Sequence, residues 1–231
     1  MSSTRQKGML ICFIGIDGSG KTTLAKYLEN CLKEYGISCK YLWWFEAESS
    51  IFRRFLRLIV FRRGDREGMD NQRTKEKLIK NPLFSIASQY LILLGYMRQG
   101  ILKVQIPRFF GKSIVCDRYI YDVIISFSID FGYTKEKFHR MMNNLLRIFP
   151  KPDLVFLVDV PEEISYRRKN DTLYPELLSK QRTIYLELGK QKQYPYRTGT
   201  KMISLDGVED LEELKYKVKR EVLELLVEKK R

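Results

Sequence analysis

The stretch GIDGSGKTT, residues 15–23, constrains the fold of this chain more than any other part of it. A short apolar run, MLICFI at residues 9–14, leads directly into it. Beyond it, apolar residues recur at helical spacing from Leu24 to Tyr35, and Gly36 ends the stripe. This pattern predicts a buried strand, a glycine-rich loop and an amphipathic helix in succession.

Four further apolar runs have the length of buried strands and lie at residues 38–45, 113–116, 154–158 and 201–205. Helical patterns fill the intervals, at residues 50–106 and 119–148, from about residue 161, at 175–192, and from Leu211 to Leu226. Continuous apolar strands that alternate with helices are typical of a parallel sheet with helices on both faces. The chain has no repeats and no low-complexity linker, so residues 1–231 are expected to form one α/β domain.

Composition favours a globular protein of the cytoplasm. Apolar residues make up 44% and charged residues 30% of the chain, and no stretch has the uninterrupted apolar length of a membrane span. The N-terminal MSSTRQKG lacks the apolar region of a signal peptide. The four cysteines show no metal-ligand spacing, and Cys12 and Cys116 lie in apolar runs, as in a reducing compartment.

The formal charge of +14 is concentrated between Arg53 and Lys80, where ten Arg and Lys stand against four Asp and Glu. A basic surface attracts nucleotides, nucleic acid or acidic lipid, but a solvated face is an equal alternative. The stretch FRRFLRLIVFRR, residues 52–63, has the pattern of a membrane-surface helix and fits a core-facing helix equally well. Basic and aromatic residues are not interleaved as in nucleic-acid binders, so neither nucleic acid nor membrane is the expected partner.

The glycine loop has the spacing G-x-x-x-x-G-K-T, formed by Gly15, Gly20, Lys21 and Thr22. Between a strand and a helix, such a loop turns backbone N–H groups toward an anion, and the helix N-terminus adds partial positive charge. Lys21 can reach the outer phosphates of ATP, and we expect it to be a solvent-facing charge in the empty loop. The ATP-binding residues predicted in this way are Gly15, Asp17, Gly18, Ser19, Gly20, Lys21, Thr22 and Thr23.

A second motif, IVCDRYIYD, places Asp117 and Arg118 at the end of the third predicted strand. Ligands of open parallel sheets bind beyond the carboxyl ends of the strands. Asp117 is therefore expected to hold Mg²⁺ together with the Thr22 hydroxyl, and Arg118 to face an anionic acceptor. The alternative is an ion pair between Asp117 and Arg118 at the strand end.

With these motifs the chain resembles the thymidylate kinase family of nucleoside monophosphate kinases. The matching stretches are FIGIDGSGKTTLAKYL, GKSIVCDRY, KPDLVFLVDVPEEISYRRK and QRTIYLELGKQ. The resemblance implies a P-loop kinase fold, with a five-stranded parallel sheet of order 2-3-1-4-5, helices on both faces and a lid. It also implies ATP and Mg²⁺ as cofactors and the reaction dTMP + ATP to dTDP + ADP.

The resemblance also assigns roles to residues. It places Asp17 near the acceptor sugar, and it places three consecutive cations over the transferred phosphate in a lid at residues 166–175, which we expect to be mobile in the empty protein. These cations are Arg167, Arg168 and Lys169. The predicted catalytic residues are Lys21, Asp117, Arg118, Arg167 and Arg168. The predicted acceptor-binding residues are Asp17, Arg98, Arg118 and Tyr119.

The acceptor region departs from the family pattern. The Arg-Glu-Pro-Gly segment that usually follows the second strand is replaced by WWFEAESSIF, residues 43–52. Its aromatic residues Trp43, Trp44 and Phe45 could stack on a base or pack in the core. Three functions therefore stay open: a thymidylate kinase or a close relative, a small-molecule kinase with a non-thymidylate acceptor, and a nucleotide-gated binder of nucleic acid or membrane. Small-molecule substrates are the expected partners, and a homodimer remains open.

Overall fold

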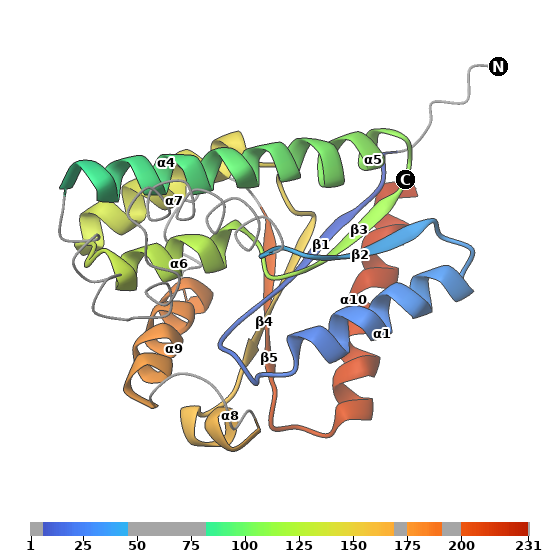
Figure 1. Cartoon of the computed structure of the whole chain (residues 1–231). Helices are drawn as coiled ribbons and strands as arrows, with labels where there is room; N and C mark the ends of the chain where they lie inside the picture. Colours follow the sequence, from blue (N-terminus) through green and yellow to red (C-terminus); the bar gives the residue numbers. More distant parts are fainter. Residues whose placement is uncertain (1–6, 46–81, 169–174, 191–199, 231) are drawn as a thin grey trace, which may run out of the picture.

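A computed structural model of the chain describes residues 7–45, 82–168, 175–190 and 200–230. Five parallel strands form one sheet in the order β2-β3-β1-β4-β5, as predicted (Figure 1). The strands are β1 Leu10–Ile14, β2 Cys39–Trp43, β3 Ser113–Asp117, β4 Leu154–Asp159 and β5 Lys201–Asp206. In the sheet register, Cys12 of β1 lies between Cys116 of β3 and Val155 of β4.

Helices cover both faces of the sheet, which confirms the α/β prediction (Figure 1). One face is covered by α1 (Lys21–Glu34) and α10 (Leu211–Lys230), and β1 contributes Ile11 and Phe13 to the core beneath them. The other face carries α4 (Pro82–Gln99), α6 (Ile120–Asp130), α7 (Lys135–Ile148) and α9 (Pro175–Lys190). Because both faces are buried, β1 is apolar at every position instead of alternating.

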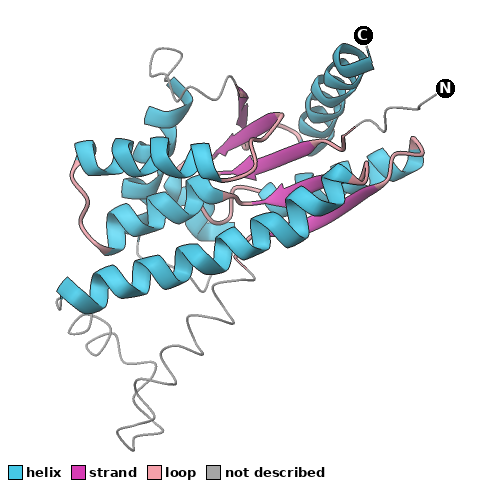
Figure 2. Cartoon of the chain, turned by 90° about the horizontal axis from the view of Figure 1, so that it is seen from above, coloured by secondary structure: helices cyan, strands magenta, loops and turns pink. Residues whose placement is uncertain are grey.

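The longest helical segment of the described residues runs from α4 through the π-helix η2 (Gly100–Gln105) into α5 (Ile106–Phe109), and Figure 2 shows it as one rod along an edge of the molecule. Near its end, Arg108 is only 3% exposed and its Nη2 lies 2.8 Å from Asp153 Oδ2. Its Nε also donates to Gly8 O at 2.9 Å. Arg108 therefore ties this rod to the start of β1 and to the loop before β4.

The remaining described helix is α8 (Glu162–Arg168), between β4 and α9. The basic cluster from Arg53 to Lys80, the stretch 52–63 and Lys169 with the rest of the lid up to residue 174 lie outside the described residues. Cys12 and Cys116 are buried, as predicted, and the other two cysteines are also buried and free. None of the described helices combines the length and the apolar character needed to cross a lipid bilayer.

Candidate active site

A cleft of about 830 Å³ lies at the carboxyl ends of the strands. Its walls come from the glycine loop and α1, from the ends of β2 and β3, from α6 and from the segments that flank the predicted lid. Of the eight predicted ATP-binding residues, all except Gly15 line this cleft. The cleft therefore brings together the two motifs that the sequence places at strand ends.

The glycines give the loop its shape. Gly15, Gly18 and Gly20 have φ angles of 139°, 76° and 97°, a region that favours glycine. At Gly15 an added Cβ would lie 2.3 Å from the carbonyl oxygen of Val158, so that position excludes larger residues. Because α1 begins after Gly20, no side chain caps its first turn, and the free N–H groups there suit an anion.

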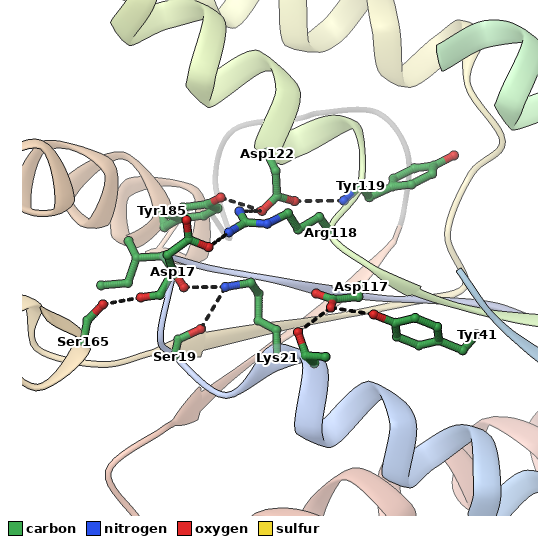
Figure 3. A network of polar contacts seen from close by, with 12 residues as sticks. Asp17, Ser19, Lys21, Tyr41, Asp117, Arg118, Tyr119, Asp122, Ser165 and Tyr185 are labelled. Atoms are coloured by element: carbon green, nitrogen blue, oxygen red, sulfur yellow. Dashed lines mark hydrogen bonds and ion pairs between the residues drawn. The ribbon is translucent and has the colours of Figure 1, made fainter. Parts of the chain in front are cut away.

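Lys21 differs from the prediction of a solvent-facing charge, because its side chain folds back into the loop. Its exposed fraction is 4%, and its Nζ donates to Ser19 Oγ at 3.1 Å and to the carbonyl oxygen of Ile16 (Figure 3). Burial, and then the nearby Arg118 charge, lower the Lys21 pKa from 10.5 to about 7. The lysine thus takes carbonyl and hydroxyl partners within its own loop.

Thr22 and Asp117 lie in contact, as a shared magnesium site requires. Thr22 Oγ1 donates to Asp117 Oδ2 at 2.5 Å, and the Tyr41 hydroxyl donates to the same oxygen at 2.9 Å. Burial and Asp117 raise the Tyr41 pKa, so this hydroxyl stays a donor at neutral pH. A hydroxyl and a carboxylate beside a phosphate loop are hard oxygen donors, and this donor set fits Mg²⁺. Tyr41 carries no assignment in the sequence analysis.

Arg118 does not pair with Asp117, so the alternative of a strand-end ion pair between them is wrong. Its guanidinium instead pairs with Asp17 and with Asp122, whose Oδ1 lies 3.2 Å from Nη1 (Figure 3). The guanidinium also lies 5.1 Å from the centre of the Phe45 ring. Among the described residues, Arg118 is the non-glycine residue with positive φ, at 69°. Such strain persists where the surroundings require one side-chain direction.

Two further residues of this network carry no assignment in the sequence analysis. Asp122 is 1% exposed and accepts from Tyr185, whose hydroxyl oxygen lies 2.6 Å from Asp122 Oδ1. Burial raises the Asp122 pKa, against the opposing effect of Arg118. The spacing of four residues from Arg118 at a helix start could have indicated Asp122. Tyr185 is brought to the site by the fold, and nothing local in the sequence indicates it.

Two of the predicted acceptor residues lie away from the cleft. Tyr119 is fully buried, packs against Trp44 with the two ring centres 4.5 Å apart and the rings tilted by 56°, and donates its hydroxyl to Pro150 O, so its position does not support an acceptor contact. Arg98 is exposed on α4 and is not among the residues that line the cleft. Of the three neighbouring aromatics, Trp44 is a core residue, whereas Trp43 and Phe45 line the cleft.

The two described lid arginines lie in the last turn of α8 and differ in position. Both are exposed, but Arg168 lines the cleft and its Nη1 donates to Gly207 O at 3.1 Å, whereas Arg167 is not among the lining residues. Arg182 of α9 connects this helix to the end of β4 and the start of α8, because its Nε lies 2.8 Å from Asp159 Oδ1 and its Nη1 lies 2.8 Å from Glu162 Oε2. Of these two arginines, Arg168 is therefore the one that lies in the same cleft as the glycine loop.

Comparison with known proteins agrees with this arrangement. The protein-family model described as Thymidylate kinase matches residues 13–218. A probable thymidylate kinase of Pyrococcus abyssi is 28% identical over 192 residues, which cover 80% of this chain and 84% of the relative. A probable thymidylate kinase of Archaeoglobus fulgidus is 29% identical over 231 residues, covering 96% and 98%. The thymidylate kinase of Plasmodium falciparum is 26% identical over 230 residues, covering 99% and 96%.

The matched range contains nearly the whole sheet, the glycine loop, Asp117 and Arg118, and both described lid arginines. The match therefore includes both sides of the cleft. The chain belongs to the thymidylate kinase family.

Proposed function

We infer that this chain transfers the γ-phosphoryl group of ATP to dTMP, giving dTDP and ADP. The observation that carries the inference is the ion pair of Asp17 and Arg118, which joins the uncapped phosphate loop to the end of β3 within one cleft. Family membership and the names of the relatives support the same reaction. The other two functions, a kinase with another acceptor and a nucleotide-gated binder, gain no support from these observations.

On the donor side, the triphosphate lies along the loop from Gly18 to Thr23, with the N–H groups of the first turn of α1 directed at its oxygens. Lys21 leaves its carbonyl partner and turns to the outer phosphates, which raises its pKa again because an anion now favours the charged form. Thr22 and Asp117 would hold Mg²⁺, which neutralises charge on the phosphate oxygens when bound.

On the acceptor side, Arg118 binds the nucleotide and Asp17 faces its sugar. Trp43, Phe45 and Ile129 form an apolar part of the cleft wall that can contact the base of the acceptor nucleotide. In the transition state negative charge spreads over the transferred group, so a cation on the lid side stabilises it more than it stabilises the ground state. Arg168 is the described cation placed for this task, because it already lines the cleft at the edge of the lid.

The test is a coupled assay of ADP release over nucleoside monophosphates, with dTMP first. We expect dTMP to give the highest kcat/KM. Arg118→Ala should raise the KM for the acceptor, lower kcat, or both, while the affinity for ATP stays nearly unchanged. Preference for a different acceptor would overturn the choice of dTMP. Equal loss of ATP and acceptor binding in Arg118→Ala would place this residue on the donor side.

We further propose that the chain forms a homodimer through the outer side of the α4 rod. Large apolar side chains are exposed there at helical spacing, namely Leu83, Ile86, Tyr90, Leu94 and Ile101. A contiguous apolar stripe of this kind is typical of helix-to-helix contacts between subunits. Light scattering after size exclusion should give a dimer for the wild type and a monomer for Leu94→Glu. A monomeric wild type would contradict the proposal.

We also propose that the chain works in the cytoplasm. All four cysteines are buried as free thiols, and burial raises the pKa of Cys39 to about 12. Free thiols are typical of proteins in a reducing compartment. Fractionation of cells that produce the tagged chain tests the location, and recovery outside the cytoplasm would contradict it.

A further inference from the structure

The two carboxylate partners of Arg118 differ in their access to the cleft. Asp17 pairs with Nη2, lines the cleft and has a side chain that is 29% exposed. Asp122 pairs with Nη1, does not line the cleft and has a side chain with no exposed surface. An anion that enters the cleft can therefore replace Asp17 beside the guanidinium, but it cannot reach Asp122.

Donors from two helices hold the Asp122 carboxylate in one orientation (Figure 3). At the start of α6, the backbone N–H of Tyr119 donates to Oδ2 at 2.9 Å. From α9, the Tyr185 hydroxyl donates to Oδ1 at 2.6 Å, and this side chain is itself 4% exposed. A buried carboxylate that accepts from fixed donors on both oxygens cannot turn without losing one of them.

Arg118 needs neighbouring residues to hold it in place, because nothing in the residue itself favours its backbone conformation or one rotamer of its side chain. Its positive φ places it in a region that non-glycine residues rarely occupy. A free arginine side chain also samples many rotamers, and freezing them on binding would weaken the binding of a ligand. The contact with Asp122 and the Phe45 ring hold the guanidinium in place before any ligand arrives.

We propose that Asp122 and Tyr185 are positioning residues that fix the Arg118 guanidinium in the cleft, while Asp17 is the partner that exchanges when the acceptor binds. The proposal rests on the proposed function for the identity of the acceptor. It assigns to α9 a role in acceptor binding, since Tyr185 reaches Arg118 only through Asp122. Neither Asp122 nor Tyr185 touches the substrate, so both affect acceptor binding by orienting the Arg118 guanidinium.

Tyr185→Phe is the sharpest variant, because it removes one hydroxyl and keeps the buried ring. We expect the KM for dTMP to rise roughly tenfold to a hundredfold, as the loss of one hydrogen bond to a charged group implies, while the KM for ATP stays within about twofold. Asp122→Asn should shift the acceptor KM in the same direction and further. The matched control is Tyr133→Phe, which loses a tyrosine hydroxyl bonded to Gln89 and should leave both KM values unchanged.

A second measurement reads the position of Arg118 without any substrate. In ¹⁵N NMR of the wild type, hindered rotation of the Arg118 guanidinium should give separate Nη signals, assigned by their absence in Arg118→Lys. These signals should merge in Tyr185→Phe and persist in Tyr133→Phe. Failure of the wild type to phosphorylate dTMP would overturn the proposed function, and this NMR comparison would still decide the positioning role.

Two results would overturn the positioning role itself. One is a Tyr185→Phe protein whose acceptor KM and Arg118 signals both match the wild type. The other is an equal rise of both KM values together with a lowered Tm, which would show a general structural effect. Should Asp122→Asn fail to fold, Tyr185→Phe decides the question alone, because it leaves the packing of α9 intact.

Discussion

Replacing the loop lysine should abolish catalysis and yet make the empty protein more stable at low pH. Lys21 is 4% exposed, and burial is the largest cause of its pKa falling from 10.5 to about 7. At about 1.4 kcal/mol for each pH unit, this difference means that the charged lysine costs the folded state about 5 kcal/mol. Lys21→Met removes that cost.

The same substitution leaves two acceptors without their donor, Ile16 O and Ser19 Oγ, which costs about 1 to 3 kcal/mol. At pH 6 the lysine is charged in both the folded and the unfolded chain, so its full cost is present. The expected net gain for Lys21→Met is therefore about 3 kcal/mol, or roughly 6 to 12 °C in Tm for a chain of this size.

The sign of the pH dependence follows from the lowered pKa. Between pH 7 and 10.5 the unfolded chain binds more protons at Lys21 than the folded chain, so wild-type stability rises with pH in this window. At pH 9.5 the remaining cost is about 1.4 kcal/mol, no larger than the lost hydrogen bonds. The advantage of Lys21→Met should therefore be close to zero there.

The assay is thermal unfolding at pH 6 and pH 9.5 without nucleotide, followed by circular dichroism. Lys26→Met is the matched control, since Lys26 is exposed on the same helix and should give no such pH-dependent difference. In the presence of Mg²⁺ and ATP, Lys21→Met should also lose the stabilisation that the wild type gains. A variant less stable than the wild type at pH 6, or a Tm difference equal at both pH values, would refute the reasoning.

Three further predictions follow from the same geometry. Arg168→Lys should lower kcat far more than it changes the Kd for ATP, because lysine lacks the planar guanidinium that binds two phosphate oxygens at once. Arg167→Lys should lower kcat less. If both variants keep a kcat within about threefold of the wild type, the lid assignment is contradicted. Asp117→Asn should raise the Mg²⁺ concentration that gives half-maximal activity, measured by titration at fixed ATP, and an unchanged titration would exclude this carboxylate from the metal site. Arg108→Ala should lower the free energy of unfolding by about 1.5 to 3 kcal/mol, measured in urea, because it removes the hydrogen bonds of a buried guanidinium to Asp153 and Gly8 O while Lys229 still pairs with Asp153, and a loss below about 0.5 kcal/mol would contradict the role of Arg108.

The sequence by itself determined the sheet and the donor side of the cleft. The three central strands, β1, β3 and β4, form nearly continuous apolar runs because both of their faces are covered, and the sequence alone shows that pattern. The phosphate loop is equally local: Gly15, Gly20, Lys21 and Thr22 are neighbours in sequence, and their spacing alone fixes their arrangement at the start of a helix. The order of the strands came from the family resemblance, since periodicity does not encode it.

The tertiary structure decided which side chains of the site interact, because these side chains come from segments far apart in the chain. Arg118 and Asp117 are adjacent in sequence but point to different neighbours, and only the fold shows that Tyr185, 63 positions beyond Asp122, completes the network. Lys21 was expected to face solvent in the empty loop, because the sequence does not show that the carbonyl oxygen of Ile16 lies within its reach. The family resemblance assigned Tyr119 to the acceptor site, yet its side chain is buried in the core. Local patterns specify elements and loops, whereas the direction of each side chain depends on contacts that form only when the elements pack together.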